Sequence, residues 1–387
     1  MLSTPLIKCL CCGGPLDELM DFGMMPLVNT YSATQKMPLA VNRCLDCCHL
    51  QLSEAVDPAV LYSDYAYCSG TGRTASDFFK SFARTALSYY PAASSVLDIA
   101  SNDGSQLDAF AELGLSTCGV DPAENLAVIA AEKGHDIRIS LFEDAKFPEG
   151  KTFDLLTAQN VVAHTARPMA FLQQCRSLMH SDSRLFIATS QANMVINGEC
   201  DTIYHEHISY FNLGSMRALA LNAGLKVLDV LMEPIHGISY VFVLGLDGEP
   251  STRVRHRALW EHTVGINGDR LYEWWTAHVR EKIYNVKQRI ESYRKDGYTI
   301  IGLGAAAKGI SMLNMAGVRL DMIMDSTKTK WGKWTSGIQI LPFQAVGHLA
   351  SEQKVLFVVL AWNVGAEIRR NAEKLRNQPQ DVFIEIR

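Results

Sequence analysis

Apolar and polar positions follow two rhythms along this chain, and together they predict repeated strand–turn–helix units. Short, nearly uninterrupted apolar runs at residues 95–99, 117–120, 153–158 and 184–189 have the length of buried parallel strands. Helical spacing separates them; the first such segment stops near Gly114. Two further apolar runs, 225–231 and 239–246, are expected to close the sheet as a hairpin. The pattern predicts a doubly wound α/β domain.

A similar plan returns near the C-terminus. Residues 252–295 have the spacing of long helices, and an apolar strand over 299–303 then runs into a small-residue turn. Gly304 and Lys308 flank the start of the next expected helix, where backbone amides and a cation attract phosphate. We assign both to substrate binding, with a packing turn and a solvated lysine as the alternative. Further strands are expected at 321–324 and 355–360.

Six of the ten cysteines precede residue 50, and four of these six form two C-x2-C pairs. This spacing lets two thiolates on a tight turn share one tetrahedral zinc ion. The predicted ligands of a structural zinc site are Cys9, Cys12, Cys44 and Cys47. Cys11, Cys48 and His49 lie beside them, and a metal-free cluster is the alternative. Because 31 residues separate the pairs, a small subdomain is expected between them.

The turn after the first strand of the middle domain indicates the cofactor. It lacks the G-x-G-x-x-G that brings a pyrophosphate close, since Ala100 and Asn102 occupy the region, and this argues against NAD. Carboxylates end both the first and the second strand, at Asp98 and Asp121, which suits the amino acid and ribose ends of S-adenosylmethionine. The predicted cofactor-binding residues are Asp98, Ala100, Asn102, Asp103, Gly104, Asp121, Pro122 and Asn160. An unrelated βα turn is the alternative.

The densest polar cluster is Tyr204-His205-Glu206-His207. Polar groups buried without partners cost about 1–3 kcal/mol each, so such density seldom serves packing alone. Glu206 beside His207 is typical of a general base with an orienting partner. A polar loop with one core histidine is the alternative.

Composition limits the partners. The chain has 387 residues, 48% of them hydrophobic, and a net charge of −5, which gives no electrostatic reason to expect nucleic acid. No apolar run approaches the roughly 20 residues that a membrane span needs, and no signal peptide is evident. We therefore expect a cytoplasmic protein, either a monomer or a weak dimer.

Several of these motifs together resemble those of the S-adenosylmethionine-dependent sugar C-methyltransferases, which modify carbon 3 of nucleotide-activated 4-keto-6-deoxy sugars. They are the C-x2-C pairs, a tyrosine-rich turn over 62–72, Leu97–Gly104, Asn160–His164 and Ile203–His207, in the family's order. The resemblance implies three parts. These are a zinc-binding domain (1–70), a Rossmann-like methyltransferase domain (71–248) and a second Rossmann-like domain that binds the nucleotide sugar (249–387).

The resemblance also implies roles for individual residues. His207 matches the family's proposed base, and the catalytic pocket is expected to contain Tyr67, His164, Tyr204, Glu206 and His207. We further assign Tyr65, Ser69, His205 and His236 to the substrate. The departure from the family pattern at Ile238 leaves the sugar open, and the departure at Cys48 is expected to change little. Two rival functions stay open: a methyltransferase of the same build acting on oxygen, nitrogen or another keto compound, and a non-catalytic binding module.

Overall fold

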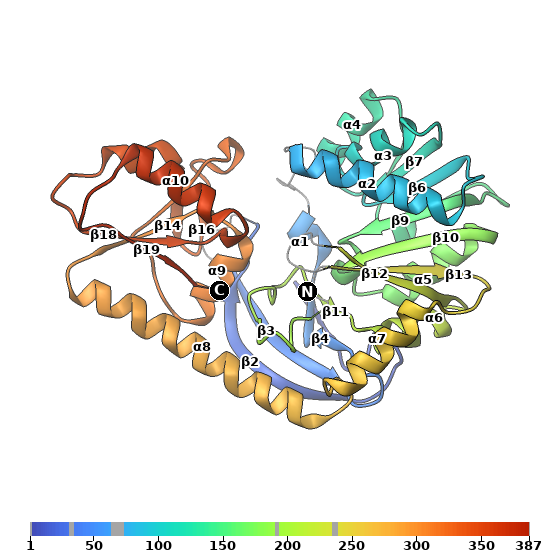
Figure 1. The fold of residues 1–387 in the computed structure, drawn as a ribbon, viewed down its shortest axis with the longest axis horizontal. Helices are drawn as coiled ribbons and strands as arrows, with labels where there is room; N and C mark the ends of the chain where they lie inside the picture. The colour runs from blue at the N-terminus through green and yellow to red at the C-terminus, as the bar shows by residue number, and fades with distance from the viewer. Residues whose placement is uncertain (1, 31–34, 63–72, 190–192, 234–238, 387) are drawn as a thin grey trace.

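The computed structural model describes residues 2–30, 35–62, 73–189, 193–233 and 239–386. Two α/β lobes lie on either side of a smaller, mainly β domain (Figure 1). The N-terminal residues supply the β domain, the middle of the chain supplies one lobe and the C-terminal third supplies the other. The predicted fold class is confirmed.

The middle lobe contains a seven-stranded sheet. In spatial order its strands are β12 (Lys226–Glu233), β13 (Ser239–Gly245), β10 (Met179–Thr189), β9 (Phe153–Gln159), β6 (Ser95–Ile99), β7 (Ser116–Asp121) and β8 (Asp136–Ile139). The five strands from β10 to β8 are parallel, and β13 runs antiparallel between β10 and β12. The expected closing hairpin is therefore β12–β13.

Helices cover both faces of this sheet because the strands are apolar on both sides. Phe82 of α2 (Arg73–Tyr89) and Phe110 of α3 (Ser105–Ala111) pack with Phe186 on one face. Helices α5 (Pro168–Ser177) and α6 (Leu213–Asn222) pack against the other face. Helix α4 (Glu124–Glu132) lies between β7 and β8 in the chain. The carboxyl ends of the parallel strands lie at one edge of the sheet, the edge at which this fold binds ligands.

A long hairpin fills the loop between the cysteine pairs. Strands β2 (Leu16–Pro26) and β3 (Lys36–Cys44) are antiparallel, and β4 (Leu50–Leu52) adds to β3. The fourth strand of this sheet, β11 (Ser209–Tyr210), comes from the middle of the chain and follows the Tyr204–His207 cluster directly. A separate pair, β1 (Ser3–Pro5) and β5 (Glu54–Val56), and the short helix α1 (Pro58–Tyr62) complete the domain.

The C-terminal lobe has a six-stranded sheet. Its strands, in spatial order, are β16 (Trp334–Thr335), β17 (Ile338–Pro342), β15 (Met322–Asp325), β14 (Thr299–Leu303), β18 (Val355–Val359) and β19 (Val382–Glu385). All neighbours are parallel except β16 and β17. Helices α8 (Asp269–Lys295) and α9 (Ala307–Met315) pack on one face and α10 (Gly365–Leu375) on the other.

Two elements span the distance between the lobes (Figure 1). One is the β2–β3 hairpin, and the other is α8, which follows α7 (Thr252–Thr263). Trp275 of α8 is fully buried and its indole donates to the carbonyl of Glu199, 2.9 Å away. Its neighbour Trp274 is 46% exposed and stacks on His278. Neighbouring residues of a helix point in different directions, so only one of the two lies on its apolar face.

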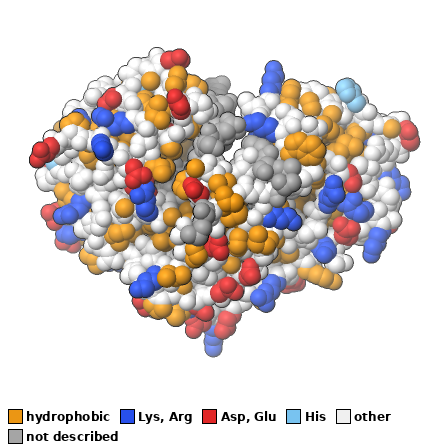
Figure 2. All heavy atoms as spheres, turned by 180° about the vertical axis from the view of Figure 1, so that it is seen from behind, with side chains coloured by type: hydrophobic (Ala, Val, Ile, Leu, Met, Phe, Trp, Pro, Cys, Tyr) orange, Lys and Arg blue, Asp and Glu red, His pale blue; other side chains and the backbone are white. Residues whose placement is uncertain are grey.

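On the back of the molecule, acidic and basic side chains are interspersed over both lobes (Figure 2). This face of the described chain therefore has no broad single-signed field that would steer a charged partner to it. No helix among the described residues is both long enough and apolar enough to cross a membrane.

Candidate active site

Asp98 lies at the centre of the open edge, near the end of β6. It is 4% exposed and accepts a hydrogen bond from the Thr157 hydroxyl at 2.5 Å. Burial raises the pKa of this carboxyl to about 7, the Thr157 hydroxyl opposes the rise and Asp121 adds to it. A carboxyl group whose pKa lies near neutral pH ionises readily when a cationic ligand binds beside it.

The turn after β6 bends through left-handed backbone at positions without glycine. Ala100 has φ 60° and Asn102 has φ 52°, conformations that cost side-chain-bearing residues energy. Gly104 has φ 77°, and a Cβ there would lie 2.9 Å from that of Ala130. The chain therefore keeps a tight turn at the mouth of the crevice although the dinucleotide glycine motif is absent.

Two neighbouring strand ends complete this crevice. Asp121 ends β7, and its two oxygens accept the amides of Asn102 and Ala123, both at 2.8 Å. Asn160 follows β9 with φ 54°, and its buried Oδ1 has no hydrogen-bond partner in the described structure. Buried polar atoms are nearly always paired, so an orphan of this kind marks a place for a ligand.

His207 has a defined tautomer. Its Nδ1 lies 2.8 Å from the carbonyl of Thr202, which can only accept, so the neutral ring carries its proton on Nδ1. The lone pair on Nε2 then accepts from the Tyr204 hydroxyl at 2.9 Å. This is the arrangement of a base: one nitrogen is fixed by the backbone, and the other keeps a lone pair that can accept a proton. Glu206 was expected either to hold this tautomer or to orient the sugar; the Thr202 carbonyl holds the tautomer, and the second role stays a prediction.

His164 and Tyr204 flank the same imidazole. The ring of His164 lies 4.9 Å from that of His207, edge to face, and the ring of Tyr204 lies 4.1 Å away. Burial lowers the pKa of His164 to about 4, so it is neutral at pH 7. A neutral imidazole and a phenol can both donate a hydrogen bond to an oxygen without adding a competing charge.

Glu206 is a buried carboxyl group within the cluster. It is 3% exposed, and neither carboxylate oxygen has a hydrogen-bond partner in the described structure. Burial raises its pKa to about 7, with a smaller opposing effect from the nearby side chain of Asn29. An unsatisfied buried carboxyl is costly, and a hydroxyl-bearing ligand would relieve that cost.

Lys308 brings the C-terminal lobe to this loop. Its ammonium lies 4.0 Å from the buried carboxylate of Asp201, six residues before His207. His205, in contrast, turns towards the β2–β3 hairpin and bonds the carbonyl of Met37 at 3.2 Å. Gly304, with φ 83°, permits the close approach of Ala361 at the turn before α9.

The second crevice repeats the design of the first. Asp325 ends β15 and accepts the amides of Ala305 and Thr327, both at 2.6 Å, as Asp121 does in the middle lobe. Here, however, the Lys330 ammonium donates to the carbonyl of Ala305 at 3.0 Å and lies 3.5 Å from Asp325. Gly302 stands where the first crevice has Asp98, two residues before the turn.

The cysteine cluster fits a zinc ion. The thiol sulfurs of Cys9, Cys12, Cys44 and Cys47 all lie within 4.8 Å of one another. Two of the sulfur pairs are 3.6 and 3.4 Å apart, close to the edge of a tetrahedron with Zn–S bonds of about 2.3 Å. Backbone amides also point at the sulfurs, as in zinc knuckles: those of Cys11 and Asp46 lie 3.4 Å from Cys9 and Cys44. Cys11, Cys48 and His49 stay outside this set.

Some assigned residues cannot be placed. Tyr65, Tyr67, Ser69 and His236 lie outside the described residues. Sequence reasoning also missed Thr157, Thr202 and Asn29, which contact Asp98, His207 and Glu206. A backbone carbonyl such as that of Thr202 leaves no sequence signal. Thr157, between apolar neighbours in the strand next to Asp98, was a visible clue.

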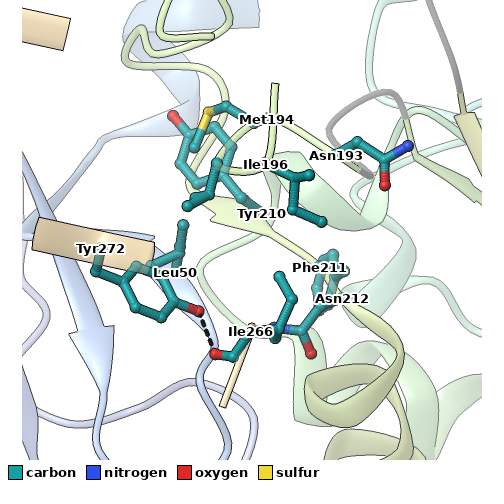
Figure 3. A pocket seen from close by; sticks show the side chains of 10 residues that line it. Leu50, Asn193, Met194, Ile196, Tyr210, Phe211, Asn212, Ile266 and Tyr272 are labelled. Atoms are coloured by element: carbon teal, nitrogen blue, oxygen red, sulfur yellow. Dashed lines mark hydrogen bonds between the residues drawn. The ribbon is translucent and has the colours of Figure 1, made fainter. Parts of the chain in front are cut away.

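A small cavity lies beside the site (Figure 3). Its walls are Leu50, Asn193, Met194, Val195, Ile196, Tyr210, Phe211, Asn212, Ile266 and Tyr272. None of the residues assigned to catalysis lines it. Instead it lies against the joint between β4 and β11, where Leu50 and Tyr210 face each other.

Comparison with known families agrees with this geometry. Three family models match successive parts of the chain: a zinc binding domain over residues 9–62, a methyltransferase domain over 72–230 and a C-methyltransferase C-terminal domain over 234–386. The fold, the crevice at Asp98 and Asp121 (the donor crevice) and these matches define an S-adenosylmethionine-dependent methyltransferase with a structural zinc site.

Individual relatives narrow the class. C-methyltransferase NovU from Streptomyces niveus is 27% identical over 96% of this chain and 93% of its own length. This relative and the match to the C-methyltransferase C-terminal domain support the resemblance to the C-methyltransferases that the sequence motifs indicated. The ubiquinone biosynthesis O-methyltransferase of Xanthomonas axonopodis pv. citri (strain 306) is 27% identical, but over only 37% of this chain and 69% of its own length.

Among solved structures, magnesium protoporphyrin IX methyltransferase (ChlM) from Synechocystis PCC 6803 aligns with 44% of this chain and 79% of its own. The TM-score of that alignment is 0.35 and the identity 14%. So low a score adds nothing to the argument.

Proposed function

We propose that this enzyme transfers a methyl group to carbon 3 of a nucleotide-activated 4-keto-6-deoxy sugar through an enolate. The observation that carries the proposal is the His207 imidazole, with Nδ1 on the Thr202 carbonyl and a basic Nε2 facing the Tyr204 hydroxyl. Methylation on carbon needs a base to remove a proton, and the ketone next to that carbon makes the proton acidic.

The residues divide the work as follows. Nε2 of His207 takes the proton from carbon 3, and the electron pair moves towards the ketone oxygen. The Tyr204 hydroxyl turns from Nε2 to the ketone oxygen when the substrate binds, which exposes the Nε2 lone pair. Tyr204 and neutral His164 then donate hydrogen bonds to that oxygen as its charge grows, and Tyr67 is assigned the same role. Glu206 accepts from a hydroxyl of the sugar. When bound in the Asp98–Asp121 crevice, S-adenosylmethionine supplies an electrophilic methyl group.

The nucleotide end of the acceptor needs a cation. Lys308 lies beside the catalytic loop, with its ammonium 4.0 Å from Asp201, and the N-terminus of α9 adds the partial positive charge of a helix start. A diphosphate there would compete with Asp201 for the ammonium. This supports the assignment of Gly304 and Lys308 to the substrate, with the C-terminal lobe holding the nucleotide.

Two measurements test the proposal. Mass spectrometry of a panel of nucleotide keto-sugars incubated with the methyl donor should find a product heavier by one methyl group. In deuterated water without the donor, carbon 3 of the true acceptor should exchange its proton. Methylation without any such exchange, or a product methylated on oxygen or nitrogen, would refute the enolate route and favour the rival methyltransferase chemistry.

A further inference from the structure

The segment that carries His207 belongs to two domains at once. Residues 201–207 form an irregular loop beside the donor crevice, but the next three residues join the sheet of the zinc-binding domain. Ser209 pairs with Gln51 and Tyr210 with Leu50, and the amide of Leu52 donates to the carbonyl of Ile208 at 2.9 Å. The strand that follows the base is therefore an edge strand of a sheet remote in sequence.

Side chains connect this strand to the second cysteine pair. His49, two residues after Cys47, bonds the Ser209 hydroxyl at 3.2 Å, and both side chains are fully buried. Asn212 donates to the carbonyl of Cys48 at 2.9 Å. Both contacts start within two residues of a zinc ligand.

The first cysteine pair reaches the same strand through Gln51. Its amide group accepts from the amide of Leu10 at 2.8 Å and donates to the carbonyl of Lys8 at 3.1 Å, on either side of Cys9. Gln51 is fully buried and lies directly opposite Ser209 in the sheet. The second half of the zinc site is thus bonded to Ser209, which starts β11, and the first half is bonded to Gln51, its cross-strand partner.

Packing on the other side of the joint is incomplete. The cavity in Figure 3 lies against Leu50 and Tyr210, and the buried Tyr210 hydroxyl has no hydrogen-bond partner in the described structure. A strand next to a void is held less firmly by van der Waals contact. The hydrogen bonds to β4 and to the cysteine loops therefore add to the packing of Tyr210 and Phe211 in fixing its position.

We propose that the zinc-binding domain positions the catalytic base, with Gln51, His49 and Ser209 as the positioning residues. An ordered cysteine site fixes β4, β4 fixes β11, and β11 fixes the loop that holds Nδ1 of His207 on Thr202. The donor crevice is built from the other sheet and does not depend on this chain of contacts. The role in catalysis rests on the proposed function; the mechanical coupling does not.

The test separates the two sites with probes that need no acceptor. Protein labelled with 15N-histidine is compared with and without zinc, the metal being removed by a chelator and its loss checked by metal analysis. The His207 signals are identified by their loss in His207→Gln. With zinc, they should show one tautomer protonated on Nδ1; without zinc, they should shift towards the averaged pattern of a loose imidazole. Calorimetry should find S-adenosylhomocysteine binding within about twofold in both.

Point variants give the same test with zinc in place. Ser209→Ala removes the His49 contact, and Gln51→Met removes both amide contacts while keeping the side-chain volume. The matched control is Ser183→Ala, which removes an equally buried serine hydroxyl bonded to the Phe153 carbonyl at the far end of β10. We expect kcat to fall at least tenfold in the first two and less than twofold in the control, with unchanged affinity for S-adenosylhomocysteine.

If the zinc-free protein stays folded and its His207 signals are unchanged, the coupling is overturned. If zinc removal unfolds the chain, unchanged His207 signals in both Ser209→Ala and Gln51→Met overturn it instead. Loss of S-adenosylhomocysteine binding in Ser209→Ala would overturn it as well, because the effect would then be general. If the signals respond as expected but no keto-sugar is methylated, the proposed function fails and the coupling stands.

Discussion

Among single side chains, His207 makes the clearest prediction. His207→Gln removes the basic Nε2, so turnover should fall by at least about 10²-fold, the usual contribution of a positioned base. Affinity for S-adenosylhomocysteine should stay within twofold, because the donor crevice is formed by other residues. Steady-state kinetics and calorimetry measure the two effects.

The control is His256→Gln, a histidine exposed on α7. It should leave both quantities unchanged. If His207→Gln still exchanges the acceptor's carbon-3 proton with solvent at the normal rate, another group is the base.

Glu206 predicts a pH effect on stability. Its pKa is about 7 in the folded chain and about 4.5 in the unfolded one, so the folded state holds its proton more tightly. The folded state therefore loses stability as pH rises between these values, by roughly 3 kcal/mol once both forms are ionised. Glu206→Gln should remove this loss: the variant should be more stable than the parent at pH 8, with a gain that shrinks towards pH 5.

Denaturant unfolding at the two pH values checks this prediction, and the same variant should lose turnover. A destabilised variant at pH 8 would mean that Glu206 has a cationic or donor partner in the folded chain. A substitution that raises stability but lowers activity is typical of a residue whose role is to bind a ligand.

Residue identity alone predicted the chemistry of this cluster better than its geometry. Glu206 next to His207 suggested a carboxylate–imidazole pair, but neighbours in an irregular loop point in different directions, and a backbone carbonyl took the expected role. The assignments of Tyr65, Tyr67, Ser69 and His236 stay predictions.

At the level of elements, α6 provides a test. Asn212 caps this helix through the amide of Ser215 and also bonds the Cys48 carbonyl beside the cysteine cluster. Asn212→Ala loses an N-cap and a buried hydrogen bond, which together should cost about 2 kcal/mol of unfolding free energy. Thermal or denaturant unfolding of the zinc-loaded protein measures the cost.

Arg217→Ala in the same helix is the comparison, since Arg217 is exposed and lies within the helix rather than at its N-cap. Its effect should stay within about 0.5 kcal/mol. Equal losses in the two variants would show that the cap is not a special restraint.

Strands with local signals were predictable, and strands defined by distant partners were not. The apolar runs that became β6, β7, β9, β14 and β18 carry their own evidence because both faces are buried. Strand β11 has two residues, and only its pairing with β4 makes it a strand. Hydrophobic spacing is local information and contains no trace of such pairing.

Across the whole molecule, Lys308 tests whether the C-terminal lobe binds the acceptor. Lys308→Gln removes the ammonium beside Asp201 and should raise KM for the nucleotide sugar at least tenfold, more at low salt than at high salt. Affinity for S-adenosylhomocysteine should not change. Lys374→Gln on the exposed side of α10 is the control.

An unchanged KM in Lys308→Gln would place the diphosphate elsewhere. The three-part plan itself was predictable, because each part has its own motif: cysteine pairs, a carboxylate turn and a second small-residue turn. The stated domain bounds remain predictions. The way α8 and the β2–β3 hairpin connect the lobes was not predictable, since it depends on how separately folded parts meet.

Lys330 has a consequence for stoichiometry. The chain contains two crevices with the same acid at the same strand end, but in the second one an internal ammonium already neutralises Asp325, and burial is offset by that contact so that the pKa of Asp325 is lowered. A ribose would find that acid occupied. We therefore expect a calorimetric titration with S-adenosylhomocysteine to end at one equivalent per chain. Each chain would then bind one methyl donor at a time.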